Sequence, residues 1–331
     1  MTSEATTGWQ IHAASRPVCA ELFGKAAGEL STSEGRRALR FEPGSRFGQA
    51  VRCSAVARWL RTNALRPPYL ELTRDGRSLP FSQYTASRTV ARVSYPGYVA
   101  ADGLFAGIAQ GASVVLNAVE EWHAPLREAC DDLADATRCR VQAVVFVTPP
   151  GARCLPPHRD DADVVVLQVH GSKHWQLWQW MPWRERPAPE CAELPPVLEH
   201  TLHAGDALYV PMGTPHSAVA SAAGSIHLTL TLRPPRVRDA LELALAQALA
   251  PVSPYAFLVG DGQARSAGLE RALRALLDRI RETDAAELLE RAENAARCRR
   301  PERIAAPAWL RDEPSAIVLD PGVAGRAGAE R

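Results

Sequence analysis

Two histidines and one aspartate, His158, Asp160 and His216, have residue types and a spacing that could bind a divalent metal ion. Two imidazoles and one carboxylate bind one face of a metal and leave the opposite positions open, as in non-haem Fe(II) oxygenases. Because residues i and i+2 of a β-strand point to the same side, one strand could aim His158 and Asp160 at a single point, and a later strand could bring His216 there. The chain has nine histidines, so a His-x-Asp tripeptide can also occur by chance. The neighbouring sequence therefore has to distinguish a metal site from a chance occurrence.

Two strands that each have a polar or mixed face are predicted beside this pattern. Val141 to Thr148 alternates between an apolar face and a face suited to lining a cavity, the latter formed by Gln142, Val144, Phe146 and Thr148. Ser225 to Leu232 alternates strictly, and its polar face consists of Ser225, His227, Thr229 and Thr231. Strands that turn such a face inward suit a barrel that holds a small ligand.

The segment that follows the His-x-Asp tripeptide is predicted to be a hairpin. The β-branched run Asp163 to His170 is expected to form a strand, Gly171-Ser172 a turn, and Lys173 to Trp178 the returning strand. If the alternation along these strands holds, the residues that face the inside of the barrel are Val164, Val166, Gln168, Lys173, Trp175 and Leu177.

One of these inward residues is a lysine, whose ammonium would lie inside the cavity beside the metal. The chain contains only two lysines, Lys25 and Lys173, although it has 38 lysines and arginines together. A buried ammonium is costly unless it meets an anion, and a carboxylate-bearing cosubstrate would provide one. The alternative is that Lys173 lies at a hairpin edge in water.

Four segments of the chain carry a recognisable series of motifs. They are Val114 to His123 (VVLNAVEEWH), Thr148 to Trp175 (TPPGARCLPPHRDDADVVVLQVHGSKHW), Tyr209 to His216 (YVPMGTPH) and Ser225 to Leu230 (SIHLTL). In this order they resemble the Jumonji-C (JmjC) oxygenases of the ribosomal-oxygenase or cupin-4 type, over roughly residues 40 to 245. The resemblance implies a mainly β protein with α elements, built on a double-stranded β-helix (cupin or jelly-roll) core.

The resemblance also implies roles for individual residues. By position, His158, Asp160 and His216 would bind Fe(II), Lys173 would pair with the distal carboxylate of 2-oxoglutarate, and Thr148 would give that cosubstrate a hydrogen bond. Further candidates for lining the cosubstrate site are Val144, Phe146, Gln168 and His227.

The chain departs from the family's usual pattern near this site. The family commonly has Tyr at the position of Arg159, and Asn and Tyr at the positions of Val144 and Phe146. By strand alternation Arg159 points away from the ligand pair, either to an outer salt bridge or to an acidic substrate. These departures put the identity of the usual substrate in doubt.

The function that the resemblance implies is hydroxylation of a protein or peptide side chain, of arginine or histidine, using dioxygen and 2-oxoglutarate and releasing succinate and CO2. Two alternatives stay open. A metal cupin of another activity, such as an isomerase, is disfavoured by Lys173. A catalytically silent cupin used for binding or regulation is disfavoured by the intact metal ligands, although the residues Val144 and Phe146 keep it open.

Composition limits the class of protein. The 331 residues are 46% apolar and 23% charged with a net charge of +1, so neither nucleic acid nor a membrane surface is an expected partner. No stretch is long enough for a transmembrane helix, and the N-terminus lacks the apolar core of a signal peptide. Seven cysteines without a C-x-x-C pair predict a reducing cytoplasm.

The expected organisation has five parts. Residues 1–14 are expected to be flexible, 15–138 to form an N-terminal α/β elaboration, and 139–235 to form the β core. Residues 236–300 contain three helical patterns, Val237 to Leu249, Ala267 to Arg281 and Ala285 to Arg297. They predict either a cap on the barrel or, as the resemblance favours, a homodimerisation module. The family that the chain resembles often adds a C-terminal winged-helix domain, and residues 301–331 are too few for a complete one. A ribosomal protein and a biosynthetic peptide are therefore both candidate substrates.

Overall fold

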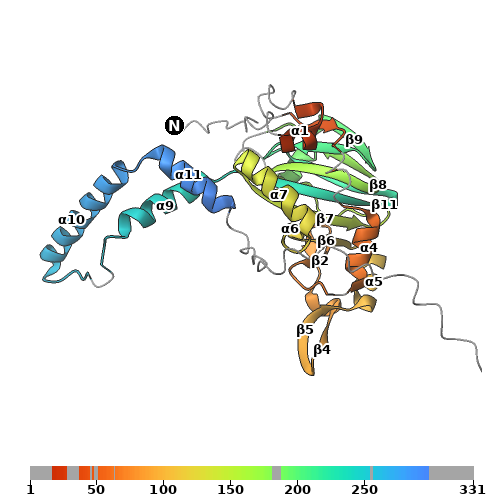
Figure 1. The fold of residues 1–331 in the computed structure, drawn as a ribbon, viewed down its shortest axis with the longest axis horizontal. Helices are drawn as coiled ribbons and strands as arrows, with labels where there is room; N and C mark the ends of the chain where they lie inside the picture. The colour runs from red at the N-terminus through yellow and green to blue at the C-terminus, as the bar shows by residue number, and fades with distance from the viewer. Residues whose placement is uncertain are drawn as a thin grey trace, which may run out of the picture. The chain divides into compact units, whose positions relative to one another are not determined.

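An antiparallel sheet is the centre of the fold in the computed structural model, which describes residues 17–27, 37–44, 47, 51–62, 64–180, 188–253 and 256–297 (Figure 1). Within these residues the sheet has nine strands. Their order is β1 (Leu39–Phe41), β10 (Ala207–Val210), β8 (Asp163–Leu177), β11 (His216–Arg233), β7 (Arg140–Thr148), β6 (Ser113–Leu116), β2 (Leu70–Arg74) and β3 (Arg77–Ser78), with β9 (Leu198–His203) paired to β8. A separate hairpin consists of β4 (Thr85–Val90) and β5 (Val93–Val99).

Helices precede, interrupt and follow the strands. They are α1 (Pro17–Phe23), α4 (Cys53–Thr62), α5 (Ala101–Ala109), α6 (Val119–Trp122), α7 (Ala124–Thr137), α8 (Ala188–Cys191), α9 (Val237–Leu249), α10 (Gly262–Arg281) and α11 (Ala285–Arg297), with a 3-10 turn at Phe81–Gln83. Among the described residues, no helix combines the length and the apolar character needed to cross a bilayer. The predicted segments 1–14 and 301–331 lie outside the described residues.

The two faces of β7 and β11 separate as the sequence predicts. On β7 the apolar face packs into the larger hydrophobic core, which α7 also enters through side chains spaced three or four residues apart. That apolar face includes Val141, Ala143 and Val145, and its counterpart on β11 includes Leu228, Leu230 and Leu232. The opposite face of both strands is left to line the interior of the barrel.

The prediction of a hairpin after the His-x-Asp tripeptide is wrong, because the structure has a single strand, β8, in this region. The chain does not turn back at Gly171-Ser172 but continues as one strand to Leu177. Its first part pairs with β10 and its second part with β9, while β11 accompanies both parts. Gly171 has φ +63°, and a Cβ there would lie 2.1 Å from the carbonyl oxygen of Gly224 on β11. The glycine therefore allows a close approach of two bent strands and does not mark a turn.

A bulge in β8 sets which of its side chains face the interior. Gln168 and His170 pair with consecutive residues of β11, so Val169 is an extra residue on β8. The extra residue shifts the alternation by one position. As a result, even-numbered residues before the bulge and odd-numbered residues after it share one buried cluster, which contains Val164, Val166, Trp175 and Leu177.

The three C-terminal helices match their predicted positions, and α9 and α11 have the predicted bounds. Helix α10 begins earlier than predicted because Asp261 caps it: the Asp261 carboxylate accepts a hydrogen bond of 2.8 Å from the backbone N–H of Ala264. Small side chains are buried on α9 and α11, namely Ala244, Ala248 and Ala292.

Candidate active site

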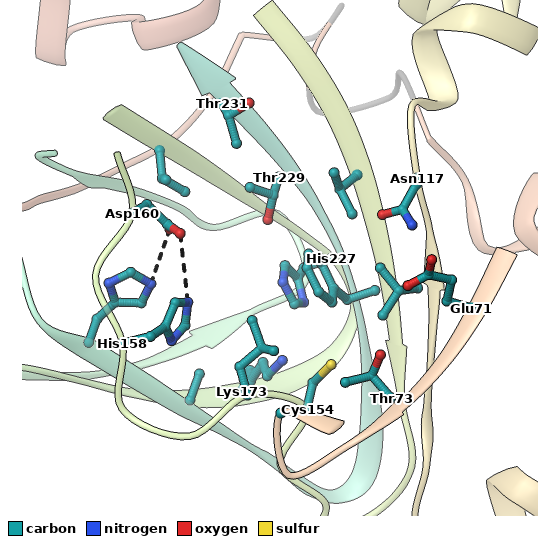
Figure 2. Close-up of a pocket in the computed structure, with 18 of the residues that line it drawn as sticks. Glu71, Thr73, Asn117, Cys154, His158, Asp160, Lys173, His227, Thr229 and Thr231 are labelled. Atoms are coloured by element: carbon teal, nitrogen blue, oxygen red, sulfur yellow. Dashed lines mark ion pairs between the residues drawn. The ribbon is translucent and has the colours of Figure 1, made fainter. Parts of the chain in front are cut away.

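A cavity of about 370 Å³ lies on the inner face of the barrel (Figure 2). Ligand sites typically have volumes of about 300–1,000 Å³, so a small cosubstrate and part of a second molecule could share it. Residues of β7, β8 and β11 line much of the cavity, among them Val144, Phe146, Lys173, Trp175, His227, Thr229 and Thr231. The mixed face of β7 and the polar face of β11 thus both contribute to the cavity, as the sequence predicts.

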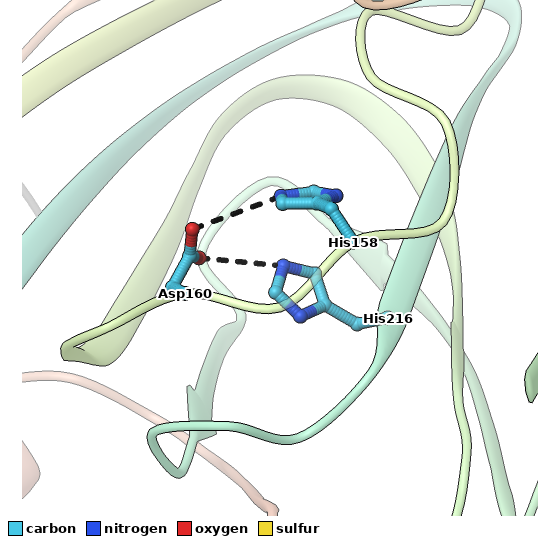
Figure 3. A group of neighbouring side chains, drawn as sticks. All are labelled: His158, Asp160 and His216. Carbon is cyan, nitrogen blue, oxygen red and sulfur yellow. Dashed lines mark ion pairs between the residues drawn. The ribbon is translucent and has the colours of Figure 1, made fainter. Parts of the chain in front are cut away.

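The His158, Asp160 and His216 side chains converge at one end of this cavity (Figure 3). His158 Nε2 lies 3.9 Å from Asp160 Oδ1, and His216 Nε2 lies 3.5 Å from Asp160 Oδ2. One ligand atom from each side chain lies within 4.8 Å of the other two. Separations of this size suit three atoms that share one metal ion, since metal–ligand bonds are about 2 Å long.

Hydrogen bonds from the opposite ring nitrogens orient both imidazoles. His158 Nδ1 lies 2.9 Å from the carbonyl oxygen of Pro156, and His216 Nδ1 lies 2.9 Å from that of Thr214. A carbonyl oxygen only accepts, so each Nδ1 carries a proton, and in the neutral form of each ring the lone pair is on Nε2. Metal-binding histidines usually have such a partner. The hydrogen bonds therefore select the tautomer that turns Nε2 of both rings toward Asp160, where a metal would bind.

The backbone brings the ligands together in a way that the sequence did not predict. His158 and Asp160 lie in the loop between β7 and β8, so the prediction that they share a strand is wrong. An isolated bridge joins His158 to His216, with mutual N–H···O distances of 3.0 and 2.9 Å. The N–H of Gly213 donates to the carbonyl oxygen of Asp160 at 3.0 Å. The loop is thus tied to the start of β11, where His216 lies.

Burial keeps His216 neutral. Loss of hydration and, to a smaller extent, the nearby His158 lower its pKa to about 4, although Asp160 and the Thr214 carbonyl act in the opposite direction. The ring is 3% exposed and stacks on Trp175 at a centroid distance of 6.0 Å. A neutral imidazole is the form that binds a metal, so His216 is ready to do so at neutral pH.

Lys173 lies on the inner wall of the cavity, and the alternative that it is a solvated hairpin edge is wrong. The residue is 3% exposed, and its Nζ donates to Thr148 Oγ1 at 3.4 Å. Within the described residues, no carboxylate pairs with this ammonium. Burial lowers the pKa of Lys173 to about 8. A buried ammonium without an anion is the arrangement expected where an anionic ligand binds.

Among the described residues that line the cavity, three buried polar atoms have no hydrogen-bond partner. They are Nδ1 of His227, Nε1 of Trp175 and Oγ1 of Thr231. Buried polar groups are normally satisfied, so atoms of this kind mark positions where a ligand or water would contribute the missing partner. His227 also stacks on Phe146, at 4.8 Å and 6°, and its pKa is held well below the usual value by burial and by Lys173.

Two of the candidate cosubstrate residues do not line the cavity. Thr148 lies behind Lys173, and its hydroxyl contacts Lys173 Nζ and Ser113. The amide of Gln168 donates to the hydroxyl of Ser225 and to the carbonyl oxygen of His170. Gln168 therefore ties β8 to β11 beside the bulge.

Several lining residues were not among the sequence candidates. Cys154 is buried near Lys173, and Glu71 and Asn117 come from β2 and the end of β6. Nothing in the sequence indicated that β2, which carries Glu71, joins this cavity. Arg159 points to α8, where it donates to Cys191 Sγ at 3.3 Å.

Two family models match the chain. The model described as "JmjC domain" matches residues 120–240, which contain the three metal-ligand candidates and Lys173. A second, described as "AraC-like ligand binding domain", matches residues 198–297, which contain β9, β10, β11 and the three C-terminal helices.

Among curated proteins, similar relatives share the description "Bifunctional lysine-specific demethylase and histidyl-hydroxylase NO66". The one from Drosophila simulans is 33% identical over 135 residues, covering 37% of this chain and 16% of the relative. The one from Dictyostelium discoideum is 34% identical over 130 residues, covering 37% of this chain and 25% of the relative. The chain therefore corresponds to a quarter or less of the length of these two proteins.

Among solved structures, YcfD, a ribosomal oxygenase from Escherichia coli in complex with cobalt and 2-oxoglutarate, is similar with 18% identity and a TM-score of 0.49. The alignment covers 82% of this chain and 71% of that chain. The family model, the order of the motifs and the sheet agree with one another on the cupin-type fold class. Over residues 120–240, the chain is similar to the JmjC domain family.

Proposed function

We propose that this chain is an Fe(II)- and 2-oxoglutarate-dependent oxygenase that hydroxylates an arginine or histidine side chain of a protein or peptide, releasing succinate and CO2. One observation carries the proposal: a two-histidine, one-carboxylate group and a buried lysine without an anion line the same cavity. The first arrangement suits a metal with open coordination positions, and the second suits a carboxylate-bearing cosubstrate.

The residues of the chain would divide the work as follows. His158, Asp160 and His216 would hold Fe(II), and Lys173 would bind the distal carboxylate of 2-oxoglutarate. Iron bound there would supply the oxidative decarboxylation of 2-oxoglutarate by dioxygen, with one oxygen atom passing to succinate and the other to a substrate C–H bond. The apolar side chains of Phe146 and Trp175 would keep water away from the reacting groups.

The direct test is an anaerobic titration of the Fe(II)-loaded protein with 2-oxoglutarate, followed by the visible charge-transfer band of the chelate. Succinate release in air is the second measurement. A band together with succinate supports the oxygenase. Bound iron without a band indicates a metal cupin of another activity, and failure to bind iron indicates a silent module.

A silent ligand-binding cupin is the second candidate function. The match of residues 198–297 to the AraC-like ligand binding model favours it, as do the apolar Val144 and Phe146 in the cavity. Such a module would bind its ligand without consuming 2-oxoglutarate, so the succinate measurement separates the two candidates.

The affinity for 2-oxoglutarate should fall as the pH rises through about 8. Burial lowers the pKa of Lys173 to about 8, so at higher pH the unliganded protein loses the proton that pairing with a carboxylate requires. Each further pH unit should therefore raise the Kd by about tenfold until the liganded form also titrates. Calorimetry with Mn(II)-loaded protein across this range measures the slope, and an equal slope in Lys173→Met would contradict the assignment to Lys173.

We propose that the helical module, residues 236–300, forms a homodimer interface. Helix α9 exposes apolar residues at every fourth position, with exposures between 42% and 77%, and α10 adds a similar row. These residues are Val237, Leu241, Leu245 and Leu249 on α9 and Leu269, Leu273 and Leu277 on α10. Exposed apolar rows of this size are typical of protein interfaces.

The double variant Leu241→Glu, Leu273→Glu should convert a dimer to a monomer, because it buries charge in the proposed apolar contact. Light scattering coupled to size-exclusion chromatography gives the mass in solution. Arg238→Ala, an exposed change on the same helix, should leave the dimer intact. A wild-type monomer would contradict the proposed interface.

We propose a cytoplasmic location. The chain has seven cysteines, an odd number, and no C-x-x-C pair. This cysteine usage is typical of a reducing compartment, where disulfides are rare.

A further inference from the structure

The cavity extends well beyond the metal-ligand candidates. His227 pairs with Phe146, Phe146 with Val115, and Val115 with Glu71, so these four residues form one row across β11, β7, β6 and β2. Neighbouring strands are about 4.8 Å apart, which places the backbone of Glu71 about 10 Å beyond that of Phe146. Figure 2 shows Asp160 and Glu71 at opposite ends of the lining, with Lys173 and His227 between them.

The Glu71 end of the cavity offers hydrogen-bond acceptors. Asn117 Nδ2 donates to the carbonyl oxygen of Pro68 at 2.9 Å, which leaves Oδ1 of the amide as an acceptor toward the cavity (Figure 2). Within the described residues, the half-buried Glu71 carboxylate has no ion pair and no hydrogen bond. An ionised carboxylate and an amide oxygen can only accept, so their complement is a group that only donates.

Charge along the cavity points to the same kind of group. Under the proposed function, the 2-oxoglutarate carboxylate neutralises Lys173 and the metal neutralises Asp160. Among the described residues that line the cavity, Glu71 is then the carboxylate whose charge remains unmatched. Removing a carboxylate partly from water without a partner costs free energy, and a cation in the cavity would recover it through charge-assisted hydrogen bonds.

We propose that Glu71, assisted by Asn117, forms a subsite that binds a guanidinium or ammonium group of the substrate. This inference rests on the proposed function only in assigning the cavity to a substrate. The subsite selects the positively charged partner, and the metal end acts on the C–H bond that the bound partner presents there.

The test compares two probes of almost equal shape, N-acetyl-arginine amide and the uncharged N-acetyl-citrulline amide. Calorimetry measures their binding first to the metal-free protein and then to the protein loaded with Mn(II) and 2-oxoglutarate. The wild type should bind the arginine probe roughly tenfold more tightly than the citrulline probe, as expected for a charge-assisted pair in a half-buried site. Glu71→Gln should abolish this preference while leaving the citrulline probe unaffected.

Asp75→Asn is the matched control. It removes the same charge from the exposed turn that follows β2, outside the cavity lining, and Asn tolerates the positive φ of 49° found there. This variant should keep the preference. A preference that survives Glu71→Gln, a preference lost equally in Asp75→Asn, or no preference in the wild type would each overturn the proposal. Because the first measurement needs neither metal nor cosubstrate, its result is separate from that of the 2-oxoglutarate titration.

Discussion

Asp160→Ala should abolish detectable succinate formation and weaken Fe(II) binding by more than about a hundredfold. Loss of a residue that merely supports a metal ligand already costs about 10–100-fold, and Asp160 is the anionic member of the group itself. The variant leaves two neutral imidazoles facing a divalent ion. Metal content after gel filtration and the 2-oxoglutarate charge-transfer band report the two effects independently of turnover.

Asp161→Asn provides the control for this experiment. Asp161 is the next residue in the same loop, but its side chain is 60% exposed and pairs with Arg233 at 2.6 Å, away from the metal ligands. Iron binding and the band should persist in this variant. Iron-dependent turnover retained in Asp160→Ala would refute the assignment of the metal site.

Lys173→Met should raise the 2-oxoglutarate concentration needed for half-maximal rate by roughly a hundredfold or more. The methionine keeps most of the volume but leaves the cosubstrate carboxylate buried without its cation, a loss that typically costs about 3–5 kcal/mol. Iron binding should remain, since Lys173 is not a ligand. An unchanged requirement for 2-oxoglutarate would show that another group anchors the cosubstrate.

The small number of lysines gives a second measurement of the same interaction. Acylation followed by mass spectrometry can follow Lys25, which is exposed, and Lys173, which is buried, in one sample. 2-Oxoglutarate should slow the modification of Lys173 alone.

Without cosubstrate, Lys173→Met should also have a free energy of unfolding about 2–3 kcal/mol higher than that of the wild type at pH 7, because the lowered pKa of Lys173 reflects the cost of burying its charge.

The sequence predicted well what depends on local alternation. The faces of β7 and β11 follow from residues two apart in the chain, and both strands line the cavity with the expected sides. It also identified the three metal-ligand candidates, because their residue types are specific. The geometric reason given for them was wrong, since a loop tied to the start of β11 brings His158 and Asp160 together.

What depends on partners distant in sequence could not be predicted. The sequence predicted neither the bulge at Val169, which depends on how β11 pairs with β8, nor the continuation of β8 past Gly171. Glu71 reaches the cavity only because β2 follows β6 and β7 in the sheet. Strand order of this kind is a property of the assembled sheet and leaves no mark on the five residues of β2.

The alternation of β8 is regular after the bulge at Val169, so one deleted codon at Ser172 would change the chemistry of the cavity. Plain alternation would then carry Lys173, Trp175 and Leu177 to the outside and turn His174 and Gln176 inward. Every residue implicated in the site would still be encoded, yet the ammonium would face solvent. Descendant genes should therefore tolerate substitutions along β8 far better than changes in its length, and a lineage with a one-residue gap there should carry a compensating gap nearby or no longer use the lysine.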